Sequence, residues 1–169
     1  MKRFIAPFSG EIVCLRLIEE SDLEKTLSWR NRDDARVWFK TSSRLALEQH
    51  QAWFNHYLNK MDDFLFIVEA GGKSVGQASV YDIQWDSGFA EVGRFLVAPE
   101  SAGKGYIDQA CAALIQLCTV TLGLRYIFLE VIDTNHRAIR IYQKNGFVEE
   151  NRYDGLLRMS ITLEVIENI

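Results

Sequence analysis

Residues 95–106 read FLVAPESAGKGY, and this stretch carries a predicted strand directly into a helix through two glycines. Gly103 and Gly105 permit a sharp turn, and their spacing can direct successive backbone N–H groups at one point. Those amides and the positive end of the following helix are typical of an anion site, with Lys104 as a cation at its rim. The loop is neither a Walker A sequence nor a dinucleotide-binding GxGxxG. Taken alone, it leaves a tight turn and an anion site as equal alternatives.

The segments on both sides of this loop predict a single α+β domain over residues 1–169, since no linker divides the chain. Ser21 and Glu24 fit a capping box that starts a helix ending near residue 30. Further helices are predicted near 34–39 and over 47–59, 110–121 and 136–145. Strands are predicted over 12–17, 64–70, 74–82, 89–97, 125–131 and 156–165. The strand–loop–helix–strand order around the glycines favours one parallel pair inside a mixed sheet.

The composition excludes several classes of function. With 48% hydrophobic and 25% charged residues, the chain has the make-up of a soluble globular protein. A formal net charge of −4 and a pI near 5.4 argue against general affinity for nucleic acid or an anionic membrane. No apolar run is long enough to span a bilayer and Pro7 interrupts the signal-like start, so a cytoplasmic location is expected. Three cysteines without a CxxC pair predict neither a disulfide framework nor a metal site.

A second motif lies downstream, where residues 135–147 read NHRAIRIYQKNGF. This segment closely resembles the late signature N-x-x-A-x-x-x-Y-x-x-x-G-F of the GNAT superfamily of acetyltransferases. The glycine loop is similar to that family's cofactor motif, with Gly105 at the central glycine. Ala102 and Ile107 depart from it, at the Gln/Arg position and the final small position. The resemblance covers residues 15–147 and implies a GNAT-like fold, a mainly antiparallel sheet flanked by helices, with acetyl-CoA as the acetyl donor.

The resemblance assigns roles around both motifs. In the family, the tyrosine at the position of Tyr142 commonly protonates the departing thiolate, and an ordinary tyrosine pKa near 10 suits that transfer. The asparagine at the position of Asn135 commonly contacts the cofactor. A core aromatic ring and a helix N-cap are the alternative explanations. The backbone of Leu96 and Val97 is expected to meet the pantetheine arm. The diphosphate is expected at the loop residues Ala102, Gly103, Lys104, Gly105 and Tyr106.

The acceptor amine arrives protonated, so a base or a water relay is needed. Glu91 is the first candidate because it precedes the predicted cofactor strand segment 93–97, where several family members carry a carboxylate. Glu130 is the second candidate and an expected acceptor contact, since it is out of phase with the apolar residues of its strand. A solvated strand position remains the alternative for both carboxylates. His50 and Trp85 are also assigned to the acceptor pocket, with a surface position and a core position as their respective alternatives.

Two further segments indicate the acceptor. SWRN at 28–31 and EQHQAWF at 48–54 look like segments of GNAT enzymes that acetylate nucleotide-linked 4-amino-sugars, including those of the pseudaminic acid pathway. Arg30 is then expected to meet a phosphate. Ribosomal-protein N-terminal acetyltransferases share the WRN-type opening and imply a protein acceptor instead. A non-catalytic acyl-CoA-binding module is the third hypothesis. A small-molecule amine partner is expected, without nucleic acid or membrane, and a homodimer is compatible with the sequence.

Overall fold

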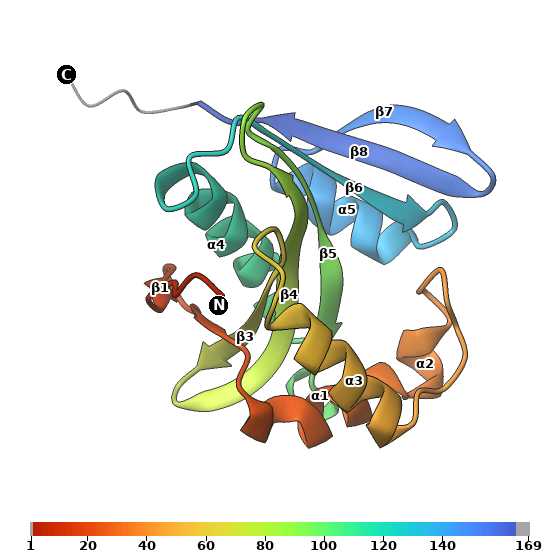
Figure 1. The fold of residues 1–169 in the computed structure, drawn as a ribbon. Helices are drawn as coiled ribbons and strands as arrows, with labels where there is room; N and C mark the ends of the chain where they lie inside the picture. Colours follow the sequence, from red (N-terminus) through yellow and green to blue (C-terminus); the bar gives the residue numbers. More distant parts are fainter. Residues whose placement is uncertain (1, 165–169) are drawn as a thin grey trace.

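The strands of the sheet pair largely in chain order. The computed structural model describes residues 2–164, and its eight strands are arranged β1-β2-β3-β4-β5-β6-β8-β7 (Figure 1). All neighbours are antiparallel except β5 and β6. The predicted mixed, mainly antiparallel sheet is therefore confirmed. The strands are β1 Phe8–Ser9, β2 Cys14–Leu17, β3 Phe64–Ala70, β4 Lys73–Gln84, β5 Phe89–Val97, β6 Tyr126–Ile132, β7 Val148–Tyr153 and β8 Leu156–Thr162.

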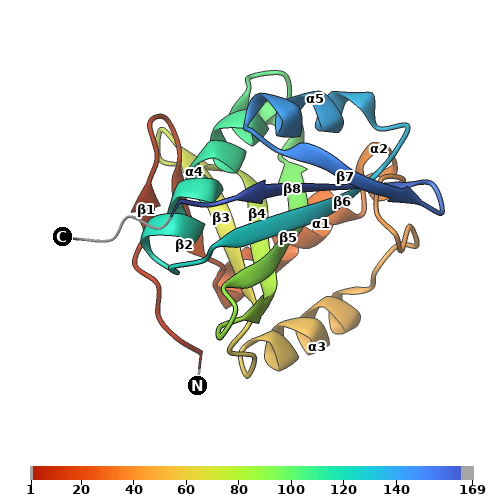
Figure 2. The same cartoon turned by 90° about the horizontal axis from the view of Figure 1, so that it is seen from above.

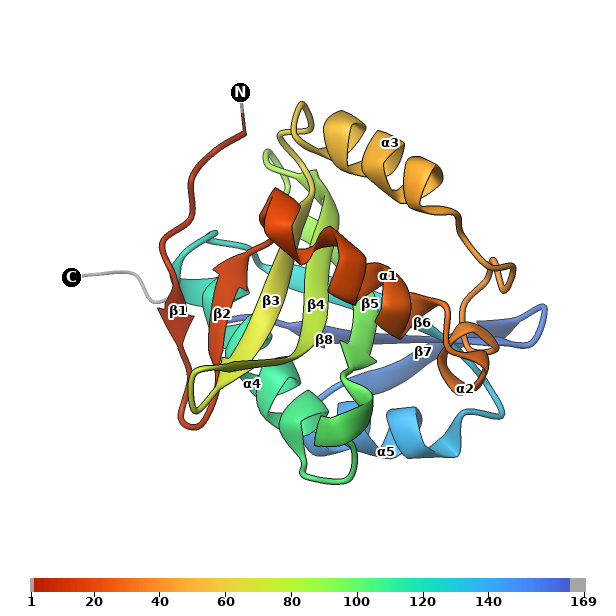
Figure 3. The same cartoon turned by 90° about the horizontal axis from the view of Figure 1, so that it is seen from below.

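Helices cover both faces of this sheet. On one face lie α4 (Tyr106–Val120) and α5 (His136–Lys144), and on the other lie α1 (Leu23–Arg30) and α3 (Leu47–Tyr57) (Figures 2 and 3). The short α2 (Asp33–Arg36) follows α1. Within residues 2–164, none of the helices combines the length and apolar character needed to cross a bilayer.

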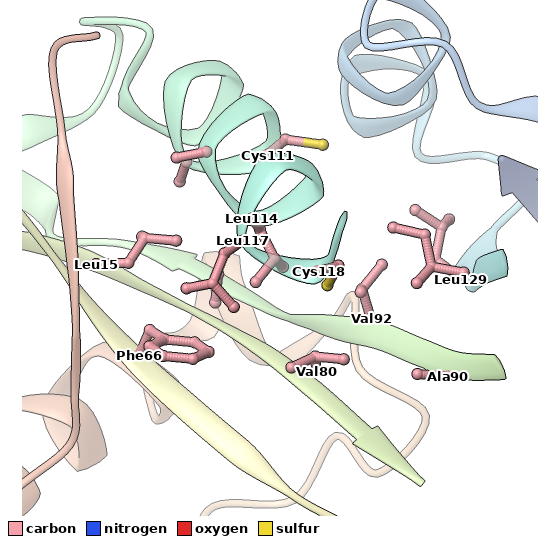
Figure 4. Close-up of a cluster of buried hydrophobic side chains, with 14 of the residues drawn as sticks. Leu15, Phe66, Val80, Ala90, Val92, Cys111, Leu114, Leu117, Cys118 and Leu129 are labelled. Carbon is pink, nitrogen blue, oxygen red and sulfur yellow. The ribbon is translucent and has the colours of Figure 1, made fainter. Parts of the chain in front are cut away.

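The main core lies between α4 and the sheet. The apolar stripe predicted for this helix is buried at Ala110, Ala113, Leu114, Leu117 and Cys118, and it packs on side chains from β2, β3, β4 and β5 (Figure 4). Cys111 of the same helix is also buried, whereas Cys14 on β2 is only partly buried. Gly105, with φ of 78°, is the N-cap of α4, so a residue without a Cβ is favoured where the loop enters the helix. Burial of this stripe fixes the glycine loop relative to the sheet.

Four details differ from the sequence predictions. The capping box at the first helix joins Glu19 and Asp22 rather than Ser21 and Glu24, because a turn of 3-10 helix over Glu20–Asp22 begins the segment earlier. β1 was not predicted, since it is only two residues long. β7 was also not predicted: every residue of this edge strand is exposed, so it shows no apolar alternation. The strand predicted over 156–165 ends at Thr162 in the structure, and position 165 of that prediction lies outside the described residues.

The parallel pair of β5 and β6 is short. β5 and β6 are nine and seven residues long, but they pair only where Phe89–Glu91 lies beside Tyr126–Phe128. Beyond Glu91 the strands diverge (Figure 1). A bulge between β4 and β5 accompanies the separation, and Arg94 at this point has a φ of +55°. The divergence opens the sheet at its centre.

Candidate active site

A cleft of about 650 Å³ opens where β5 and β6 separate. Its walls come from these two strands, from the start of α5, and from the segment that runs from the end of α1 through α2 to residue 41. It collects predicted site residues from four separate parts of the sequence. Those that line it are Arg30, Glu91, Leu96, Val97, Ala102, Glu130, Asn135 and Tyr142.

One end of the cleft lies beside the glycine loop. Gly103 and Gly105 both have positive φ, 77° and 78°, as a sharp turn into a helix requires. Within the described part of the chain, the backbone N–H groups of residues 103–105 have no hydrogen-bond acceptor. Such amides at a helix start are available to an anion. Ala102 and Ile107 line the cleft, whereas the predicted residues Gly103, Lys104, Gly105 and Tyr106 do not.

The wall formed by β5 has free backbone groups. Because pairing with β6 stops at Glu91, no strand of residues 2–164 lies beside the cleft-facing edge of β5 from Val92 to Val97. Its N–H and C=O groups can therefore bond to a ligand that carries amides. On its other edge β5 stays fixed to β4, where Leu96 is paired with Gln77. The Leu96 side chain is buried with Trp29 and Ala98, so it holds the strand in place.

Tyr142 and Asn135 line the cleft from α5. The Tyr142 ring packs near Phe95 and Phe147, at centroid distances of 5.6 and 6.1 Å, and only 8% of the residue is exposed. Burial raises the pKa of its hydroxyl, which therefore holds its proton at neutral pH. Asn135 caps α5 by accepting the N–H of Ala138 at 3.4 Å. It is thus an N-cap, and its place in the cleft also allows a ligand contact.

The two carboxylates in the cleft differ in their electrostatics. Burial raises the pKa of Glu91 and outweighs the opposite effect of Lys40. Burial also acts to raise the pKa of Glu130, but hydrogen bonds from Tyr153 and Lys40 outweigh it and lower that pKa. The Lys40 ammonium lies 2.9 Å from Glu130. The Glu130 carboxylate is therefore ionised and already accepts hydrogen bonds from Lys40 and Tyr153. Of the two carboxylates, Glu91 is the one suited to accept a proton.

Arg30 combines a stacked guanidinium with an unused donor. Its Cζ lies 4.5 Å from the centroid of the Phe39 ring, and its Nη2 donates to the carbonyl of Thr41. Nη1 is buried and has no hydrogen-bond partner within residues 2–164. Burial and the nearby Arg36 lower the pKa of Arg30. Arg30 lines the cleft, and a buried donor without a partner is costly, so its guanidinium is a candidate contact for a bound ligand.

Two residues predicted for the acceptor pocket do not reach the cleft. His50 lies between α1 and α3, 2.9 Å from the hydroxyl of Thr26, and stacks on Trp53. Burial lowers its pKa, so it is a neutral side chain of the helix interface. Trp85 lies in the turn between β4 and β5, where its ring meets Phe64 edge-on and its Nε1 donates to the carbonyl of Met61. The structure therefore does not support an acceptor-binding role for either side chain.

Three residues that the sequence did not indicate also line the cleft. Lys40 lies on a loop without periodicity, and nothing local marks it as a site residue. Tyr81 stands directly opposite Glu91 across the β4–β5 pair. The hairpin register would have indicated Tyr81, because opposite residues of an antiparallel pair share a face. Arg94 lies at the bulge and forms a two-point ion pair with the buried Asp63, at 2.7 and 3.1 Å.

The comparison with known proteins identifies the family. The model of the acetyltransferase (GNAT) domain family matches residues 13–148 of this chain. The spermidine N(1)-acetyltransferase of Vibrio cholerae is 26% identical over 159 residues, 87% of this chain and 91% of the relative. The aminoglycoside N(6')-acetyltransferase type 1 of Klebsiella pneumoniae is 28% identical, over 86% of this chain and 79% of the relative. The similarity therefore extends over most of this chain and of each relative.

The fold of a solved relative agrees with this result. The V. cholerae spermidine N-acetyltransferase in complex with CoA and spermine superposes with a TM-score of 0.83 at 24% identity, over 90% of this chain and 96% of that one. The free amides at residues 103–105 and the open edge of β5 also fit a donor that carries a diphosphate and an amide-bearing arm. The chain therefore belongs to the GNAT family of acetyltransferases, and it is an N-acetyltransferase whose acetyl donor is acetyl-CoA.

Proposed function

We propose that the acceptor is a small molecule that carries a primary amine and an anionic group, namely a nucleotide-linked deoxy amino-sugar acetylated at its 4-amino group. The observation that supports this most is Arg30 in the lining of the cleft, because its guanidinium has no hydrogen-bond partner at Nη1 within residues 2–164. A phosphate is a suitable acceptor for a buried guanidinium N–H. Phe39, on which Arg30 stacks, adds an apolar surface for a sugar ring.

The charge of the cleft supports the same acceptor class. Although the chain has a formal net charge of −4, the cleft is lined by five cationic and three acidic side chains. Arg32, Lys40 and Arg94 are held in ion pairs with carboxylates. The remaining cations are Arg30 and Arg137. A positive surplus in an acidic protein favours an anionic acceptor and disfavours a polycation.

The cleft residues divide the chemistry between them. Acetyl-CoA, when bound, supplies a thioester whose carbonyl carbon can accept an amine and whose sulfur leaves. The amides of residues 103–105 and the free edge of β5 bind and orient this donor. Glu91 takes a proton from the acceptor ammonium at a carboxylate oxygen, directly or through a water. Tyr142 holds a proton at its hydroxyl oxygen and gives it to the departing sulfur.

A polyamine or aminoglycoside acceptor is the second candidate. It is favoured by the names of the relatives, which are spermidine and aminoglycoside acetyltransferases at 26 to 28% identity. The two carboxylates Glu91 and Glu130 would be its contacts in the cleft. Charge distinguishes the two candidates, because one acceptor class needs Arg30 and the other is repelled by it.

A panel of acceptors tests the proposal. Thiol release from acetyl-CoA is measured with nucleotide-linked 4-amino-sugars, spermidine, an aminoglycoside and peptides with a free N-terminus. We expect kcat/KM to be at least about 100-fold higher for a nucleotide-linked sugar than for spermidine, the effect of two charge-assisted hydrogen bonds. Faster turnover of spermidine, the aminoglycoside or a peptide would reject the acceptor class. Tight CoA binding without turnover of any amine would point to a non-catalytic module.

Substitution of Arg30 gives a sharper prediction. In Arg30→Gln, we expect KM for the anionic acceptor to rise about 10- to 100-fold with little change in kcat, because a charge-assisted bond is lost. Arg30→Lys keeps the charge but not the two-pronged geometry and should fall between Arg30→Gln and the wild type. Arg152→Gln is the control, since Arg152 is an exposed residue of β7 paired with Glu149. Equal KM values for all four proteins would exclude Arg30 as the anion contact.

A further inference from the structure

Tyr81 and Glu91 form a pair across two strands of the cleft. Tyr81 on β4 stands directly opposite Glu91 on β5, and both side chains line the cleft. The Tyr81 hydroxyl lies against β5 at Gly93, two residues beyond Glu91, and it lowers the pKa of the Glu91 carboxyl. Burial raises the pKa of Tyr81, so the hydroxyl remains protonated and can donate throughout the working range of pH. The pair therefore combines a permanent donor with the carboxylate proposed as base.

The position of the Tyr81 ring is fixed by a cation. The Cζ of Arg94 lies 4.3 Å from the centroid of the Tyr81 ring. Arg94 is itself held by the two-point ion pair with Asp63, whose side chain is only 2% exposed. The backbone carbonyl of Arg94 accepts a hydrogen bond from Nε2 of Gln77 at 3.0 Å. The bulge residue is thus anchored at both its backbone and its side chain, and its guanidinium covers the ring of Tyr81.

The hydroxyl of Tyr81 occupies space left by a glycine. A Cβ added at Gly93 would lie 2.7 Å from the Tyr81 hydroxyl oxygen, closer than such atoms can approach. Gly93 lies two residues beyond Glu91 on the same strand. The absence of a side chain here therefore allows the hydroxyl to lie against β5 beside Glu91.

Four groups act on the ionisation of Glu91 besides burial. Lys40 on the loop lowers its pKa, while Glu130 on β6 and Asp82 on β4 raise it. The Tyr81 hydroxyl lowers it. Lys40 is already bound to Glu130, so its attraction is shared between two carboxylates. Tyr81 is then the uncharged donor that favours the ionised form of Glu91.

We propose that Tyr81 is a positioning residue whose hydroxyl holds the Glu91 carboxylate ionised and directed at the acceptor amine. This role rests on the proposed function of Glu91 as the base. Asp63, Arg94 and Gly93 support it indirectly, by fixing the ring and by leaving room for the hydroxyl. The network therefore extends from the interior of the protein to the reacting proton.

The first test measures Glu91 itself and needs no acceptor. The pKa of Glu91 is followed by carboxyl NMR in the free protein, with the resonance assigned from Glu91→Gln. We expect Tyr81→Phe to raise this pKa by about one unit, as the loss of a charge-assisted bond predicts. Tyr126→Phe is the matched control, because it also removes a hydroxyl that bonds a glutamate, Glu150, outside the cleft. An unchanged Glu91 pKa in Tyr81→Phe, or an equal shift in Tyr126→Phe, would overturn the proposal.

The second test measures the reaction. In Tyr81→Phe, the acid limb of kcat/KM should move to higher pH by the same shift, and kcat/KM near neutral pH should fall up to about tenfold. Gly93→Ala should move the acid limb of kcat/KM in the same direction. This variant keeps the Tyr81 hydroxyl, but the new methyl group displaces it from its place beside β5. A shifted Glu91 pKa with an unchanged pH profile would overturn the base role of Glu91, and with it the positioning role. An unshifted pKa with normal turnover would overturn the positioning role alone.

Discussion

Replacement of Tyr142 by phenylalanine is expected to lower turnover at least about 100-fold while leaving CoA affinity within about twofold. A positioned general acid contributes roughly 10²- to 10⁴-fold, and the substitution removes the proton but not the ring. The ring contacts with Phe95 and Phe147 are retained. Turnover is measured as thiol release under saturating acetyl-CoA, and CoA affinity by calorimetry. The combination of low kcat and unchanged affinity is the mark of a group that acts only in the chemical step.

Tyr57→Phe is the contrasting control. The Tyr57 hydroxyl accepts the backbone N–H of Leu65 at 3.0 Å, and only 1% of this residue is exposed. Its loss leaves a buried amide without a partner and should lower the free energy of unfolding by about 1–3 kcal/mol, with turnover unaffected. For the Tyr142 hydroxyl, no protein hydrogen bond is found in the described part of the chain, so Tyr142→Phe should preserve stability. A Tyr142→Phe protein with normal turnover would refute the assignment of Tyr142 as the acid.

The features of the site that are local in sequence were predictable. Gly105 and Asn135 are both residues at helix starts, and each acts within a few residues of itself. The apolar stripe of α4 follows helical periodicity and is buried as expected. The strand, loop and helix that form the donor end of the cleft could therefore be predicted from short segments.

The acceptor side was harder to predict because it depends on how distant segments pack. Trp85 follows a strand, but its ring packs on Phe64 of another strand rather than in the cleft. Lys40 reaches Glu130 although the two are 90 residues apart in sequence. His50 is different, since His50, Phe54 and Tyr57 have the i, i+4, i+7 spacing of a buried helix face. That spacing favours a core position for His50, which had been predicted instead in the acceptor pocket or at the surface.

Gly76→Ala is expected to have the largest effect on stability, a loss of about 3 kcal/mol or more in the free energy of unfolding. Gly76 lies within β4, between Val68 on β3 and Val97 on β5. A Cβ added there would lie 2.3 Å from the carbonyl oxygen of Leu96. Since that atom belongs to the backbone of a paired strand, no side-chain rotation can relieve the clash. β4 and β5 must separate at the contact.

The same substitution should weaken CoA binding, because the displaced part of β5 is the wall of the cleft at Leu96 and Val97. Gly72→Ala is the control: its φ is +77°, and a Cβ there meets nothing within 4 Å. Backbone strain alone should cost Gly72→Ala about 1–2 kcal/mol and leave CoA affinity unchanged. Urea unfolding and calorimetry with CoA measure both quantities. If Gly76→Ala were no less stable than Gly72→Ala and bound CoA equally well, close approach of β4 and β5 would not be what positions the donor wall.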